Sequence, residues 1–202
     1  MLAFAIVFQG IPPVFSFIVS ALGISHAQAG ALMSFFALPG IFISIPAGIM
    51  TDVYGSKRVG LIALAITFAG ALLVVLANGY SLLVIGRIIS GIGALTIAIV
   101  APQALSRWFA KEDLGKAMGI FNTAMPLGTI FMLNVFGRLA TAWNWRVPML
   151  LTSVYCIFVL ILFYFKYPSL PRGKGQQKPA FKKSVHAIRK TGWLVWAVAV
   201  IW

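Results

Sequence analysis

Six long apolar stretches constrain this chain more than any other feature of its sequence. Each approaches the roughly 20 residues that a helix needs to cross the hydrocarbon core of a bilayer. Short polar segments separate the stretches, and 61% of the 202 residues are hydrophobic whereas only 9% are charged. The stretches cover residues 1–22, 28–51, 59–78, 82–105, 115–137 and 147–166. Because a soluble core of this size could not bury so much apolar surface, the sequence predicts an all-α membrane protein, a six-transmembrane-helix bundle.

The basic residues are distributed unevenly along the chain. Of the 16 Lys and Arg residues, 13 lie in the connections that follow the second, fourth and sixth stretches. The opposite connections hold only Arg138 and Arg146, together with Trp143 and Trp145, which are expected to mark the outer membrane interface. The asymmetry predicts a multi-pass protein of the plasma membrane, a bacterial inner membrane, with a cytoplasmic N-terminus. Since the bases flank apolar stretches, the net charge of +13 indicates a lipid bilayer and not nucleic acid as the partner.

The composition changes after the sixth stretch. We expect residues 1–167 to form the N-terminal bundle and residues 168–190, rich in Pro, Gly and Lys, to form a basic cytoplasmic linker. Within this linker, a short helix lying on the membrane surface and a solvated segment remain alternatives. Apolar residues then resume, so residues 191–202 are predicted to be the truncated start of a seventh transmembrane helix.

Glycines, one acid and two bases are closely spaced between the second and third stretches. Gly48, Asp52, Gly55, Lys57 and Arg58 form the pattern G-x-x-x-D-x-x-G-x-K-R. This pattern resembles the loop between the second and third helices of major facilitator superfamily (MFS) transporters. The resemblance implies that the loop latches a cytoplasmic gate against the other half of the transporter. A turn that only sets the topology is the alternative interpretation.

Arg87 lies inside the fourth apolar stretch. An arginine there costs about 2.5–3.5 kcal/mol on insertion scales, so it should face a cavity or a partner, unless it extends outward to the membrane surface. Together with Gly91 and Gly93 it resembles the fourth-helix motif R-x-x-x-G-x-G of the same superfamily. The resemblance implies a role for Arg87 in substrate or proton handling.

Small residues recur at helical spacing in two of the stretches. Close packing between helices needs such residues, because they let backbones approach one another. We therefore predict helix contacts along two faces, formed by Gly40, Ser44 and Gly48 in the second stretch and by Gly86, Ser90, Gly91 and Gly93 in the fourth.

Prolines and a few polar residues interrupt the first and fifth stretches. Pro12 and Pro13 are predicted to break the first helix, and breaks at membrane depth tend to line cavities, so Gln9 is a candidate for substrate binding. The fifth stretch contains Asn122 and Thr123 as further candidates, and Pro126 is predicted to kink it. Its sequence only loosely resembles the fifth-helix motif of MFS exchangers, because Met125 and Thr129 replace glycines.

Together the motifs resemble the N-terminal half of an MFS transporter, which implies a secondary active transporter working by alternating access. Arg87 without any acid deep in the membrane favours an anionic or neutral solute. The alternative is a non-transporting membrane module or an inactive fragment. The chain has no cluster of metal ligands and no nucleophile paired with a base, so no metal, no cofactor and no enzymatic activity are predicted. The expected partners are a small-molecule substrate and either a missing C-terminal half or a second copy in a homodimer.

Overall fold

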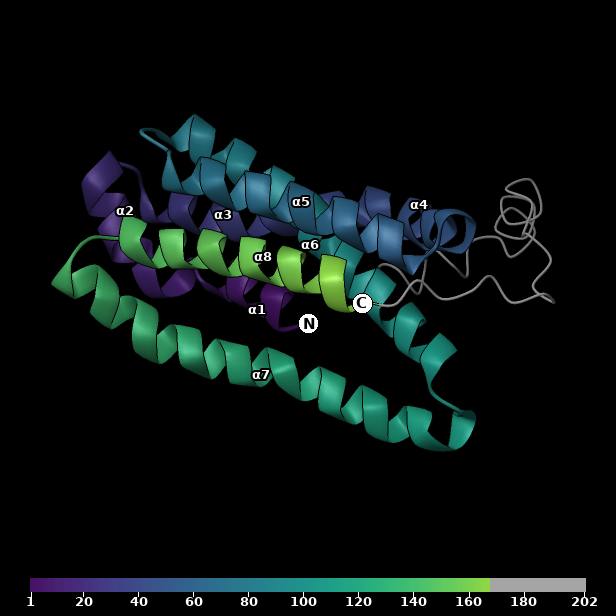
Figure 1. Cartoon of the computed structure of the whole chain (residues 1–202). Helices are drawn as coiled ribbons and strands as arrows, with labels where there is room; N and C mark the ends of the chain where they lie inside the picture. Colours follow the sequence, from purple (N-terminus) through teal and green to yellow (C-terminus); the bar gives the residue numbers. More distant parts are fainter. Residues whose placement is uncertain (168–202) are drawn as a thin grey trace.

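The computed structural model describes residues 1–167, which form a bundle of membrane-spanning helices with no strand among them (Figure 1). The predicted linker 168–190 and the predicted seventh helix 191–202 lie outside the described residues. Within residues 1–167, six segments are long and apolar enough to span a membrane, which confirms the predicted fold class. They are α1 (Leu2–Gln9) with η1 (Pro12–Val14) and α2 (Phe15–Leu22), α3 (His26–Ala37) with α4 (Pro39–Tyr54), α5 (Ser56–Val75), α6 (Tyr80–Trp108), α7 (Lys111–Ala142) and α8 (Arg146–Lys166).

Short local signals set the turns between these spans. Ser25 and Gln28 form a capping box that starts α3, in which the backbone N–H of Gln28 donates to the Ser25 hydroxyl at 3.1 Å. Gly23 and Gly55 end the first and second spans with φ of +62° and +87°, a conformation that favours glycine. Only Gly55 separates α4 from α5, so the chain reverses there within a single residue.

The α5–α6 pair forms the centre of the bundle, because glycines let the two backbones approach closely. A Cβ atom on Gly86 would lie 2.9 Å from the backbone nitrogen of Val74, and one on Gly93 would lie 2.5 Å from that of Thr67. Gly91 faces the backbone of Phe36 in α3 instead, and so brings α3 against α6 from another side. The predicted small face of the fourth stretch therefore contacts two different helices.

The predicted small face of the second stretch makes looser contacts. A Cβ atom on Gly40 would lie 3.2 Å from the Cδ1 atom of Leu95 in α6, and one on Gly48 would lie 3.5 Å from the side-chain nitrogen of Gln103. Ser44 is exposed and donates its hydroxyl to the carbonyl of Gly40 in its own helix. This face therefore touches α6 at Gly40 and Gly48, and not at Ser44.

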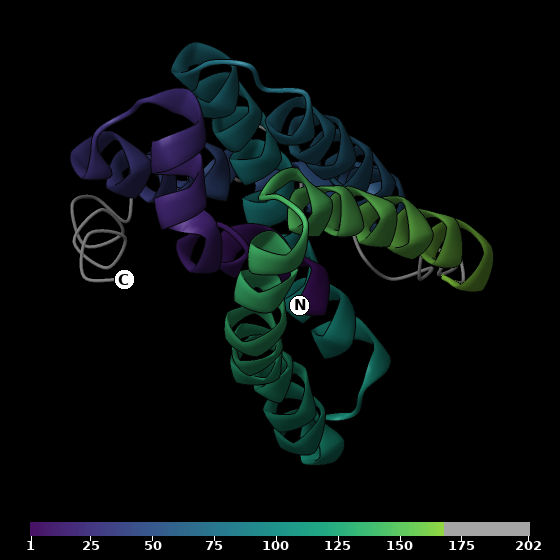
Figure 2. The same ribbon diagram turned by 90° about the vertical axis from the view of Figure 1, so that its left-hand side faces the viewer.

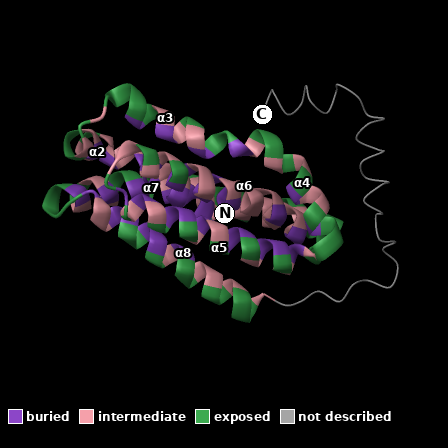
Figure 3. Ribbon diagram, turned by 90° about the horizontal axis from the view of Figure 1, so that it is seen from above, coloured by how far each residue is buried: buried purple, intermediate pink, exposed green. Residues whose placement is uncertain are grey.

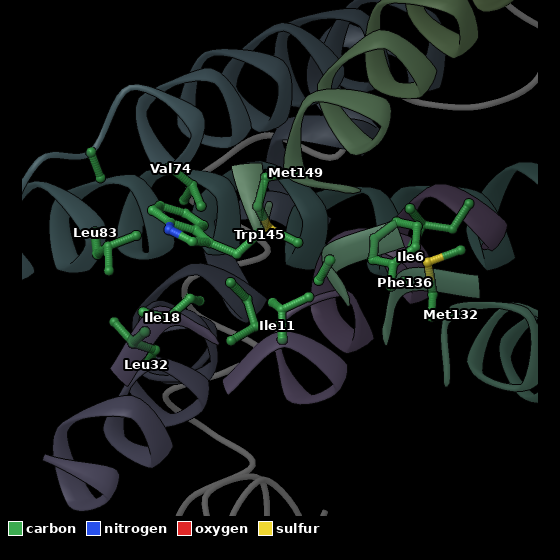
Figure 4. Close-up of a cluster of buried hydrophobic side chains, with 13 residues drawn as sticks. Ile6, Ile11, Ile18, Leu32, Val74, Leu83, Met132, Phe136, Trp145 and Met149 are labelled. Carbon is green, nitrogen blue, oxygen red and sulfur yellow. The ribbon is translucent and has the colours of Figure 1, made fainter. Parts of the chain in front are cut away.

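A cluster of buried apolar side chains lies toward the end of the bundle opposite Gly55, where the predicted loops of low charge lie (Figure 4). Trp145 belongs to this cluster, with Val74 and Leu83 as further members, and is only 4% exposed. The prediction that Trp145 marks the membrane interface is therefore wrong, because the turn before α8 directs its ring into the core. Trp143 is 76% exposed.

Helix α7 is the least covered of the six spans. In its most apolar 18-residue segment 17% of the residues are buried, against 50% in the first span. Figures 1 and 2 show α7 diverging from α8, and exposed residues also recur along α4 and α8 (Figure 3). Large apolar side chains such as Ile120 and Leu127 of α7 remain 76% and 62% exposed. A water-soluble protein would not expose such a surface, whereas lipid or a second bundle can cover it.

Replacement of Gly93 by alanine should destabilise the bundle, because the new methyl group meets the α5 backbone. Overpacking of this kind costs about 1–3 kcal/mol, so the melting temperature in detergent should fall. Gly119→Ala is the matched control, because no atom lies within 4 Å of its Cβ position and alanine favours a helix. Equal melting temperatures for the two variants would contradict the α5–α6 packing.

Candidate functional site

The side chain of Arg87 lies inside the bundle and is 1% exposed. Its Nη1 atom donates to the carbonyl of Val7 at 2.7 Å, and its Nη2 atom donates to that of Phe8 at 3.4 Å. Its Nε atom donates to the carbonyl of Leu32 in α3 at 3.2 Å. The guanidinium also lies over the ring of Phe36, 4.3 Å from the ring centroid. Arg87 thus joins three spans, and it does not extend to the membrane surface.

The break in the first span explains why these carbonyls are available. Helix α1 ends at Gln9, and a short 3₁₀ turn over Pro12–Val14 separates it from α2. The last carbonyls of a helix have no partner within the helix, and Pro12 has no N–H to offer the carbonyl of Phe8 four residues earlier. Hydrocarbon offers no hydrogen-bond partner, so an unpaired carbonyl would be costly within the membrane. Arg87 supplies the missing donors from a neighbouring helix.

The hydrogen bonds of Arg87 offset the free-energy cost of burying its charge in the membrane. Each contributes about 1.5–3 kcal/mol, and Arg87 makes three to backbone carbonyls. Together they exceed the insertion cost of about 2.5–3.5 kcal/mol for an arginine at mid-membrane. The positive charge also lies at the C-terminal end of α1, where the helix dipole favours a cation. The buried cation therefore needs no carboxylate as a partner.

A small cavity adjoins the guanidinium among residues 1–167. It has a volume of about 10 Å³, and its polar lining comes from Arg87, Ser90 and Thr152. This is room for one water molecule, not for a solute. In this arrangement Arg87 holds the broken first span in place.

The other predicted binding residues do not gather around Arg87. Gln9 is half-buried at the end of α1, directly after the two carbonyls that Arg87 binds. Asn122 and Thr123 are exposed on α7, where the Thr123 hydroxyl donates to the carbonyl of Ile120 at 2.7 Å. Helix α7 continues through Pro126 without interruption. Gln9 is therefore the predicted polar residue closest in sequence to the Arg87 contacts.

The motif loop carries an ion pair between two spans. Asp52 at the end of α4 pairs with Arg107 at the end of α6, with 2.6 Å between Oδ1 and Nη2. Both side chains remain partly exposed, so the pair contributes at most about 1 kcal/mol to stability. Lys57 and Arg58 follow Gly55 in the first turn of α5. We call this end of the bundle the Asp52 end, and the opposite one the Asn78 end.

Sequence reasoning missed several partners in these contacts. Nothing in the motif identified Arg107 as the partner of Asp52, because a pattern local to one loop does not show which distant helix end packs against it. At the Asn78 end, Arg146 donates to the carbonyl of Ala77 and to the side chain of Asn78, both at 2.9 Å. A signal for the acceptors of Arg87 did exist, since Pro12 and Pro13 imply carbonyls without donors within the membrane.

The six apolar spans define a multi-pass helical membrane protein. The chain belongs to the Major Facilitator Superfamily, whose sequence model matches residues 1–202. The predicted superfamily is therefore confirmed.

Curated relatives of this chain carry transporter names. It is 27% identical to a hexuronate transporter of Bacillus subtilis, over 82% of this chain and 39% of that protein. It is also 27% identical to the putative transporter AraJ of Escherichia coli, over 95% of this chain and 48% of that protein. The chain thus spans less than half the length of these relatives.

Solved transporter structures share the fold at low sequence identity. The peptide transporter POT matches all of this chain and 44% of its own length, with a TM-score of 0.73 and 18% identity. The inward-open xylose transporter XylE of E. coli matches 99% of this chain and 52% of its own length, with a TM-score of 0.73 and 17% identity. These likenesses show the fold, which is that of one six-helix half.

Replacement of Arg87 by methionine should destabilise the bundle strongly, because it leaves the carbonyls of Val7 and Phe8 without donors. Each unpaired carbonyl costs about 1–3 kcal/mol, so a clear drop of the melting temperature in detergent is expected. Arg138→Met is the matched control on α7, where the arginine is exposed. If both variants melt alike, Arg87 does not support the break in the first span.

Proposed function

We propose that this chain forms one bundle of a secondary active transporter, which moves a small anionic or neutral solute by alternating access. The observation that carries the proposal is the buried Arg87 cation at the break of the first span. The chain's three acids are Asp52, Glu112 and Asp113, and all of them lie at the Asp52 end of the bundle. The interior is therefore positive, and it favours anions over cations.

Three of the relatives have names that agree in chemical class with this proposal. They are a hexuronate transporter, a probable L-galactonate transporter of E. coli and a nitrate/nitrite transporter of Picosynechococcus. Hexuronate, galactonate and nitrate are all anions. In this proposal Gln9 contacts the solute next to the Arg87 guanidinium, which caps the end of α1. Asn122 and Thr123 contribute further contacts with the solute from α7.

Alternating access needs a second bundle that rocks against the first one around a midplane site. We propose that the exposed face of α7 packs against such a bundle, either a C-terminal half or a second copy of this chain. The curated relatives named above are more than twice as long as the stretch they share with this chain, which supports a second half. The proposed membrane is the bacterial inner membrane, with residues 168–190 as a cytoplasmic linker toward residues 191–202.

The Asp52 end is proposed to be cytoplasmic and to carry the gate. Asp52 and Arg107 tie α4 to α6 there, while Gly48 and Gly55 set the helix approach and the turn. Lys57 and Arg58 then face the anionic surface of the inner leaflet. An exposed ion pair is weak enough to open and close during a transport cycle.

Uptake into proteoliposomes, with the chain paired to its second half, tests the proposal. Labelled glucuronate should enter faster than in protein-free liposomes. Gln9→Ala should reduce uptake about tenfold if it removes one hydrogen bond to the solute. Asp52→Asn should also reduce uptake while it changes the free energy of unfolding by less than about 1 kcal/mol.

Ser106→Ala serves as the control in these uptake assays, because this exposed hydroxyl only contacts its own helix at the carbonyl of Gln103. It should transport like the parent chain. If no anionic or neutral solute enters with any partner half, the non-transporting module is the better description. Normal uptake by Asp52→Asn would contradict the gate.

Cysteine labelling tests the proposed orientation in intact cells. In a Cys156→Ser background, Arg58→Cys should react only with a reagent that crosses the membrane, and Ala142→Cys should also react with an impermeant one. Both positions are exposed, and they lie at opposite ends of the bundle, which makes each the control of the other. The reverse labelling pattern would place the basic loops outside.

A further inference from the structure

A cavity of about 280 Å³ lies toward the Asp52 end of the bundle, away from Arg87. Its walls are almost entirely apolar and come from α1, α5, α6, α7 and α8. They include Leu2, Leu64, Val100, Leu105, Phe121 and Val159. Figure 2 shows α7 and α8 diverging on either side of the start of α1, and all three helices contribute residues to the lining. A polar solute would lose its hydration there without gaining hydrogen bonds.

The cavity ends in a group of aromatic and polar side chains. Tyr167 and Trp108 both line it, and their ring centroids are 4.7 Å apart. The Tyr167 hydroxyl and the nearby Ser56 hydroxyl are buried, yet neither has a hydrogen-bond partner among the described residues. The two hydroxyls are neighbours, and an oxygen-bearing group placed between them would find two donors.

The surroundings of Tyr167 keep its hydroxyl available as a donor. Burial raises the pKa of Tyr167, and the neighbouring Ser56 hydroxyl and Arg107 guanidinium only oppose this increase. The tyrosine is therefore neutral at physiological pH, and its O–H can donate to an oxygen of a ligand.

Positive charge flanks this end of the cavity. Arg107 precedes Trp108, and Lys166 precedes Tyr167, at the ends of α6 and α8. Asp52 neutralises part of the charge of Arg107, whereas Lys166 is exposed and has no ion pair among the described residues. We call the apolar part of the cavity the chamber, and its end at Trp108, Tyr167 and Lys166 the mouth. An apolar chamber with a basic, hydrogen-bonding mouth is complementary to an anionic amphiphile.

We propose that this cavity binds an acyl chain of an anionic phospholipid, with the headgroup oxygens at Tyr167 and Ser56 and near Lys166. The exposure of the cavity wall supports a lipid as the occupant. Leu2 and Trp108 line the cavity and are still 38% and 40% exposed, so it opens to the surrounding hydrocarbon. The site is separate from the proposed solute path along Gln9 and Arg87.

Photo-crosslinking distinguishes an inserted chain from lipid that merely surrounds the bundle. The full chain is placed in nanodiscs with phosphatidylglycerol that carries a diazirine on its acyl chain, and the adducts are mapped by mass spectrometry. Val100 and Ala104 line the cavity and are only 3% and 6% exposed, so surrounding lipid should not reach them. Adducts on both residues are expected, together with adducts on exposed Phe158 of α8.

Two variants test the chamber and the mouth separately. Ala101→Phe fills the cavity, and should remove the adducts on Val100 and Ala104 while those on Phe158 remain. Tyr167→Phe keeps the ring but loses the donor, and should weaken competition by unlabelled phosphatidylglycerol about fivefold. The controls are Val154→Phe and Tyr164→Phe on α8, which lie outside the cavity lining and should change neither result.

Several results would overturn the proposal. Absence of adducts on Val100 and Ala104 in the parent chain would show that no acyl chain enters. Equal competition by phosphatidylcholine would contradict the preference for an anionic headgroup, and an unchanged Tyr167→Phe variant would contradict the mouth. None of these three results depends on Ala101→Phe, so they still decide the question if that variant does not fold.

Discussion

The contact between Arg87 and the end of α1 is the interaction on which the rest of the bundle depends. The break in the first span leaves carbonyls without donors inside the membrane, where hydrocarbon offers no replacement. Arg87 donates to two of these carbonyls and to a third in α3, so a single guanidinium holds three spans together. The break and the charge offset each other, because each alone would be costly in a membrane.

Close packing between helices makes this contact possible. Gly91 lies one turn after Arg87 and meets the backbone of Phe36 in α3, while Gly86 and Gly93 meet α5 on another side. A larger residue at these positions would push the helices apart and move the guanidinium away from its acceptors. The small-residue pattern thus serves to position a charge as well as to pack helices.

The sequence predicted the spans well, because hydrocarbon thickness and apolar length are linked directly. It also identified Arg87 as a buried and constrained residue, since an arginine inside an apolar stretch is costly. The paired prolines indicated free carbonyls in the first span, but only the fold links those of Val7 and Phe8 to Arg87 and adds Leu32, because every residue carries the same carbonyl. Trp145 was wrongly placed at the interface for a related reason: an aromatic residue near a helix end suits both lipid and core.

The exchange of the Arg87 Nε–H proton with solvent is the measurement that tests this account most directly. In a sample with ¹⁵N-labelled arginine, the bond to the carbonyl of Leu32 predicts slow exchange for this proton, and exposed Arg138 predicts fast exchange under the same conditions. The slow signal should disappear in Arg87→Lys. If the Arg87 signal exchanges as fast as that of Arg138, the guanidinium is hydrated and does not cap the broken first span.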